Sequence, residues 1–242
     1  MERDWGLTVR ICSILGWLGA ALALSACAQN PHHLNTTYLD RYAEPNPTPA
    51  RFLECRGFSC TESSHVALSG KAWRRVGAVF KPPAKNAEVE RRRIAQGVAM
   101  IRLLVGAQTG TAVHQWTHKD MKILPNLGDP TQLDCIDEAV NTWTYLTLME
   151  RGGLFRFHRV AQLSSAGSLV EPRNTAVLHE VGGDYFAIDS SLVDAGVPPP
   201  IMPLATWLGH WPPDLSATAT TALEPRQRTA KRSAHLNSTS TP

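Results

Sequence analysis

The thiol of Cys135 is the side chain of this sequence best suited to covalent chemistry. It lies in QLDCIDEAVNTWTYL, where we predict a helix from about residue 133 to residue 149. In the first turn of a helix, unsatisfied backbone N–H groups and the helix dipole favour a thiolate, which is the form that attacks a carbonyl carbon. Asp134, Asp137 and Glu138 crowd the same turn, and their charge opposes thiolate formation. The alternative is a buried structural cysteine.

A base and an orienting carboxylate would have to come from the strands that follow this helix. The stretch 154–163 is rich in strand-forming residues, and 175–181 and 184–190 flank Gly182-Gly183, a pair that predicts a hairpin. These strands carry His158, His179 and Asp189.

The length of the hairpin loop decides whether His179 and Asp189 share a face of the sheet. A two-residue loop pairs residue 179 with residue 186 and puts the two side chains on opposite faces. A three-residue loop that includes Asp184 pairs residue 179 with residue 187 and makes the two side chains diagonal neighbours on one face. His158, on the preceding strand, is the other candidate base.

A cysteine at a helix start, followed by strands bearing a histidine and then an aspartate, resembles the transglutaminase-like cysteine hydrolases over roughly residues 132–191. The resemblance implies an α+β, papain-related domain with the cysteine-bearing helix packed on an antiparallel sheet. It implies that Cys135 is the nucleophile, that Asp189 orients the imidazole and that the bond attacked is a peptide or amide bond. The family histidine usually precedes the aspartate by 14–16 residues, and Thr175 stands 14 before Asp189 here. The nearest histidine of the hairpin is His179, so we assign the base to His179. We expect no cofactor.

Cys55 and Cys60 lie five positions apart in CRGFSC, and Gly57 between them tolerates a turn with positive φ. In an exported protein this spacing favours a local disulfide. It could also form half of a metal site, but no second half with comparable spacing is found. His114 and His118 have a spacing that could bind a metal, but their neighbours predict a loop. We expect a disulfide and no metal.

The N-terminal segment predicts export. Residues 11–26 form an uncharged apolar run, shorter than the about 20 residues of a membrane-spanning helix and typical of a secretory signal. The run ends on Leu24-Ser25-Ala26-Cys27, which resembles a bacterial lipobox. The resemblance implies cleavage before Cys27 and a diacylglyceryl group on its sulfur, and Ala28 favours the outer over the inner membrane. The alternative is an uncleaved anchor, or an ordinary signal in which Cys27 is incidental.

The rest of the chain divides by composition. Residues 27–50 contain several prolines and no apolar periodicity, so we expect a flexible tether. One α+β domain is predicted over 51–213, with a helix at 87–105 whose triple arginine, 91–93, lies on the solvent side. Trp207 and Trp211 are expected to pack against the core. The segment 214–242 is rich in Ser, Thr and Ala and is predicted to be disordered.

Composition narrows the class of protein. The chain has 242 residues, 43% hydrophobic and 19% charged, which excludes a disordered or polytopic membrane protein. A formal net charge of +3 is too small to make nucleic acid the expected partner. The sequence predicts a lipoprotein anchored to the membrane by its lipid, facing the periplasm, with thiol hydrolase or transacylase activity. The alternative is a catalytically inactive lipoprotein that binds envelope proteins or cell-wall peptide.

Overall fold

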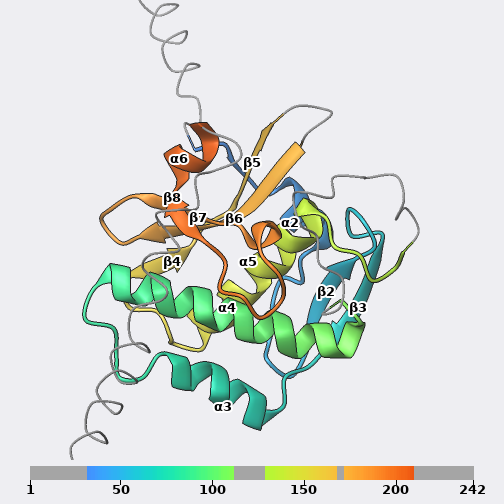
Figure 1. Ribbon diagram of the computed structural model, residues 1–242, viewed down its shortest axis with the longest axis horizontal. Helices are drawn as coiled ribbons and strands as arrows, with labels where there is room; N and C mark the ends of the chain where they lie inside the picture. The colour runs from blue at the N-terminus through green and yellow to red at the C-terminus, as the bar shows by residue number, and fades with distance from the viewer. Residues whose placement is uncertain (1–31, 112–128, 168–171, 210–242) are drawn as a thin grey trace, which may run out of the picture. The chain divides into compact units, whose positions relative to one another are not determined.

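The chain folds as a mixture of helices and antiparallel strands (Figure 1). The computed structural model describes residues 32–111, 129–167 and 172–209. The helices are α2 (Thr37–Tyr42), α3 (Gly70–Val79), α4 (Ala87–Thr109), α5 (Cys135–Arg151), α6 (Leu204–Gly209) and the 3-10 helix η2 (Ser190–Leu192). The strands are β1 (Leu34–Asn35), β2 (Phe52–Arg56), β3 (Glu62–Val66), β4 (His158–Val160), β5 (Leu163–Gly167), β6 (Pro172–Glu180), β7 (Tyr185–Ile188) and β8 (Ile201–Pro203). The predicted α+β class is confirmed.

The main sheet is centred on β6, its longest strand. Its order is β1-β5-β6-β7-β8, and β4 pairs with the end of β6 that β5 leaves uncovered. All of these pairs are antiparallel. The strands β2 and β3 form a separate two-stranded sheet that packs through β2 against α5. The helix α5 therefore lies between the β2–β3 hairpin and β6.

The two faces of β6 contribute to two different parts of the core. Because successive side chains of a strand point to opposite faces, Ala176 and Leu178 lie on one face and Val177 on the other. The first face joins the larger apolar cluster, which includes α4 and α5. The second joins a smaller cluster with Trp207 of α6. Trp207 is fully buried, as expected, so α6 covers the face of the sheet opposite to α5.

The start of α5 is fixed by its own side chains. The Asp134 carboxylate caps the helix by accepting hydrogen bonds from the backbone N–H groups of Ile136 and Asp137, both at 2.9 Å. The Asp137 carboxylate in turn accepts a bond of 3.1 Å from the backbone N–H of Asp134, which completes a capping box. The helix thus begins at Cys135, in the first turn as predicted. It ends at Arg151, just before the two predicted glycines, and Gly153 adopts a φ of +70°.

The prediction of a flexible tether over residues 27–50 is wrong from Leu34 onward. Leu34 and Asn35 form β1, which pairs with β5, and α2 follows it directly. Leu39 of α2 is buried, and Tyr38 and Tyr42 pack on the core. A helix of six residues with three side chains packed on the core is enough to dock this segment, although it is too short to give a clear periodicity in the sequence.

Two of the three arginines predicted to lie on the solvent side of α4 form contacts with the rest of the fold. Arg91 forms an ion pair with Glu180 at the end of β6, and its guanidinium lies 4.0 Å from the centre of the Phe186 ring. Arg93 donates to the backbone oxygens of Phe80 and Pro82. These arginines therefore fix the first turns of α4 to the sheet and to the end of α3.

Several sequence predictions lie outside the described residues. They are the signal peptide with its lipobox and Cys27, the histidines 114 and 118, Trp211 and the tail 214–242. Among the residues that the structure describes, none of the helices combines the length and the apolar character needed to cross a lipid bilayer.

Candidate functional site

The sulfur of Cys135 lies beside the beginning of β6. Its Sγ accepts a hydrogen bond from Nδ2 of Asn174 at 3.5 Å, and the thiol donates to the backbone oxygen of Pro172, also at 3.5 Å. Asn174 is buried, whereas Cys135 is partly exposed and Pro172 is exposed. The side chain that contacts the thiol is therefore a carboxamide, which does not accept a proton at neutral pH.

A chain of polar side chains holds this carboxamide in place. Ser165 faces Asn174 across the β5–β6 pair, and its hydroxyl donates to Asn174 Oδ1 at 2.7 Å. The Ser165 Oγ accepts in turn from Nδ2 of Asn35 on β1 at 3.0 Å. With its oxygen occupied in this way, the Asn174 amide presents its NH2 group to the Cys135 sulfur. Asn174 carries no signal of its own in the sequence, because only the pairing of β5 with β6 and their packing on α5 brings it to the thiol.

The structure does not bring His179 to Cys135. The hairpin loop comprises residues 181–183, so His179 pairs with Tyr185 and not with residue 186 or 187. Its ring stacks on Tyr185, with the ring centres 4.5 Å apart. His179 is five residues beyond Asn174 on β6, which is ~16 Å along the strand and on the opposite face. The assignment of His179 as the base of Cys135 does not agree with this geometry.

His158, the other candidate base, has a structural role. Its side chain is fully buried, and its Nδ1 lies 2.9 Å from the Glu90 carboxylate of α4. Glu90 also accepts hydrogen bonds from three backbone N–H groups, those of residues 156–158. Burial lowers the pKa of His158. His158 pairs with Glu180, six residues from Asn174, and is thus ~20 Å from Cys135 along the sheet.

Asp189 follows the last residue of β7 and precedes η2. Its buried carboxylate accepts hydrogen bonds from the Trp207 indole at 2.8 Å and from the Ser191 hydroxyl at 2.6 Å. Ala176 pairs with Ile188, so one more residue in the same register would bring Thr175 opposite Asp189. Thr175, which stands 14 residues before Asp189, is buried and donates its hydroxyl to a backbone oxygen. Neither Thr175 nor Asn174 supplies an imidazole.

Electrostatics around Cys135 disfavour the thiolate. Burial, with the negative charges of Asp134 and Asp189, raises the pKa of the Cys135 thiol to about 11, and the hydrogen bond from Asn174 only partly offsets this. The predicted effect of the helix N-terminus is therefore outweighed. At neutral pH only on the order of one thiol in 10,000 is ionised at such a pKa.

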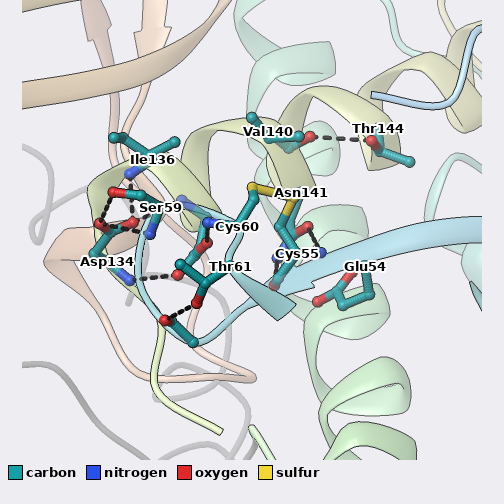
Figure 2. The surroundings of a disulfide bond; sticks show 12 residues. Glu54, Cys55, Ser59, Cys60, Thr61, Asp134, Ile136, Val140, Asn141 and Thr144 are labelled. Atoms are coloured by element: carbon teal, nitrogen blue, oxygen red, sulfur yellow. Dashed lines mark hydrogen bonds between the residues drawn. A yellow bond between two sulfur atoms is a disulfide. The ribbon is translucent and has the colours of Figure 1, made fainter. Parts of the chain in front are cut away.

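The predicted disulfide is present. Cys55 of β2 and Cys60 are joined, with their Cα atoms 4.7 Å apart (Figure 2). Both are buried, and the Asp137 carboxylate lies with the two sulfurs in a cluster whose ligand atoms are within 4.8 Å of one another. Among the described residues, this is the only group of at least three potential metal ligands.

A second buried polar group lies deeper along α5. The Tyr145 hydroxyl donates to the Glu54 carboxyl group and lies 2.7 Å from each of its two oxygens. Arg102 forms a buried ion pair with Glu138. These four side chains line a small cavity. Burial raises the pKa of Glu54 to about 8, so this carboxyl group retains its proton at neutral pH.

Comparison with known proteins adds no assignment, since no protein-family model, no curated protein and no solved structure matches the chain. The candidate site is therefore defined by its geometry alone: a partly exposed thiol with a high pKa, in contact with a carboxamide.

Proposed function

We propose that this protein is an exported lipoprotein, anchored by a lipid on Cys27, whose α+β domain is a catalytically silent relative of the transglutaminase-like cysteine hydrolases. In this proposal the domain binds peptide segments, from an envelope protein or from the cell wall, and does not cleave them. The observation that carries the proposal is the contact between the Cys135 sulfur and the Asn174 carboxamide, at the place where a hydrolase needs a base.

The arrangement of elements supports the relationship to that family. Cys135 is the first residue of α5, the helix packs on the antiparallel sheet, and Asp189 directly follows the strand after the hairpin. What differs is the chemistry of the intervening residues on β6. A thiol needs a nearby base or cation to ionise at neutral pH, and here burial and two carboxylates act in the opposite direction.

The surroundings of Cys135 support recognition of a peptide. The thiol is partly exposed, and Pro172, whose carbonyl oxygen contacts it, is exposed. Tyr38 of α2 is partly buried near the same thiol. Burial raises the pKa of the Tyr38 hydroxyl, and the negative charge of an ionised Cys135 adds a smaller contribution in the same direction. A backbone carbonyl and a phenol provide an acceptor and a donor of the kind that an amide ligand requires, next to an aromatic surface.

Substitution of Cys135 by serine is expected to leave peptide binding unchanged. Wild-type protein and Cys135→Ser would each be incubated with a proteolytic digest of cell-envelope proteins and with soluble cell-wall peptides. Peptides retained by the protein would then be identified by mass spectrometry. We expect the same peptides to be retained by both proteins, with no peptide shortened and no covalent adduct on Cys135, because no step depends on the thiolate.

Two results would contradict the proposal. Shortened peptides, or an acyl adduct on Cys135 that forms with wild type and is lost in Cys135→Ser, would establish a hydrolase. Retention of no peptide by either protein would exclude the binding function.

A further inference from the structure

Cys55, Cys60 and Asp137 form a buried cluster whose chemistry goes beyond a structural disulfide. The exposed fractions of the three residues are 1%, 8% and 0%. One sulfur from each cysteine and one carboxylate oxygen of Asp137 lie within 4.8 Å of one another. Thiolates and carboxylates at such distances are ligands for Zn²⁺ and related cations.

The backbone around both cysteines is held to α5 without the help of the sulfur–sulfur bond. The carboxamide of Asn141 forms two hydrogen bonds of 2.8 Å with the backbone N–H and oxygen of Cys55 (Figure 2). On the other side, the backbone N–H of Cys60 donates to Asp137 Oδ1 at 2.6 Å. The two cysteines therefore remain close to Asp137 when the disulfide is open.

The turn between the cysteines is fixed in the same way. Phe58, Ser59 and Cys60 all have positive φ, a conformation that L-residues rarely adopt. Hydrogen bonds to the start of α5 compensate, since the N–H of Phe58 donates to Asp137 and that of Ser59 to Asp134. An unfavourable conformation of three successive residues persists only when the surrounding structure determines it.

A second observation points to a cation. Asp134 and Asp137 are both buried and lie next to each other, yet neither forms an ion pair with a basic residue in the described part of the chain. Asp137 Oδ1 accepts one hydrogen bond, from Cys60, which leaves a lone pair for a further partner. That lone pair faces the two sulfurs closely enough to be donated to a metal ion bound between the three side chains.

We propose that the dithiol form of Cys55 and Cys60 binds a thiophilic divalent cation of the zinc type, with Asp137 as third ligand and solvent in the fourth position. The disulfide bond is first broken by a dithiol reductant, which is itself oxidised to a disulfide and transfers two hydrogen atoms to the two sulfurs. The two thiols then lose their protons to solvent as the metal–sulfur bonds form. The pair thus alternates between a disulfide and a metal site, depending on the redox state.

Cobalt titration of the full chain tests this proposal. The protein would be reduced with a phosphine and titrated with Co²⁺, whose tetrahedral thiolate complexes give a sulfur-to-cobalt charge-transfer band and intense visible bands. We expect one equivalent to bind to the reduced protein and none to the oxidised protein, and Zn²⁺ to displace the Co²⁺. Cys55→Ser should lose the charge-transfer band, and Asp137→Asn should weaken binding on the order of tenfold or more.

Cys135→Ser is the matched control, because it removes a thiol of the same chain that is not part of the cluster. It should bind Co²⁺ as the reduced wild type does. Asn keeps an acceptor oxygen on one side only of the hydrogen bonds that Asp137 accepts at both of its oxygens, so circular dichroism would verify that each variant is folded. Absence of the charge-transfer band in the reduced wild type, or its loss in Cys135→Ser, would overturn the proposal.

Discussion

Asn174→His is expected to activate Cys135, making it react with iodoacetamide at pH 7 on the order of tenfold to a hundredfold faster than the wild-type thiol. The substitution places an imidazole where the carboxamide now contacts the sulfur at 3.5 Å. An adjacent imidazolium stabilises the thiolate and lowers the thiol pKa from about 11. The gain in ionised fraction is larger than the accompanying loss of intrinsic nucleophilicity. Mass mapping of each cysteine-containing peptide gives the rate for Cys135 separately.

Asn174→Gln is the control for this substitution, since it enlarges the side chain without adding a base. Its Cys135 should react as slowly as that of the wild type. If Cys135 reacts equally slowly in Asn174→His and Asn174→Gln while both remain folded, an imidazole at position 174 does not activate the Cys135 thiol.

Glu54→Gln is expected to stabilise the protein at alkaline pH and to have little effect at pH 5. Burial raises the Glu54 pKa from 4.5 to about 8. Between these values the folded protein retains a proton that the unfolded chain has lost, so the free energy of unfolding falls as the pH rises through this range. By pH 9 the ionisation of Glu54 lowers the free energy of unfolding of the wild type by on the order of 4 kcal/mol, a loss that Glu54→Gln does not have. The glutamine keeps an oxygen to accept from the Tyr145 hydroxyl, and it does not ionise.

Urea unfolding of wild type and variant at pH 5 and pH 9 measures this effect. The comparison of the two proteins cancels the contribution of Asp137, whose pKa is also raised, to about 7, by burial and by Asp134. Glu62 is exposed and lies on the neighbouring strand, so Glu62→Gln should change neither the free energy of unfolding nor its dependence on pH. Equal dependence of unfolding on pH in wild type and Glu54→Gln would show that Glu54 is ionised in the folded state.

The features that the sequence predicted correctly depend on neighbouring residues. The Cys55–Cys60 disulfide follows from a spacing of five, and the start of α5 follows from Asp134, whose carboxylate bonds to residues two and three positions later. The glycines that end α5 and turn the hairpin also act locally. Such features need no knowledge of the distant parts of the chain.

The features that the sequence predicted wrongly depend on register between distant segments. A hairpin loop of residues 181–183 pairs His179 with Tyr185, one or two positions from the pairings considered, and this moves the imidazole away from Asp189. The place of Asn174 beside Cys135 depends on the packing of β6 on α5. The ordered segment before residue 50 depends on β5, more than 100 residues later, with which β1 pairs. No short pattern encodes these relationships.

The pH dependence of Cys135 alkylation in the wild-type protein tests the central claim, that this thiol is not activated. The rate for the Cys135 peptide would be measured with iodoacetamide at intervals from pH 6 to pH 10, with folding verified at each pH. A pKa of about 11 predicts a rate that rises about tenfold per pH unit across this range without a plateau. A plateau at or below pH 8.5, the value of a free thiol, would contradict the account and identify Cys135 as an activated nucleophile.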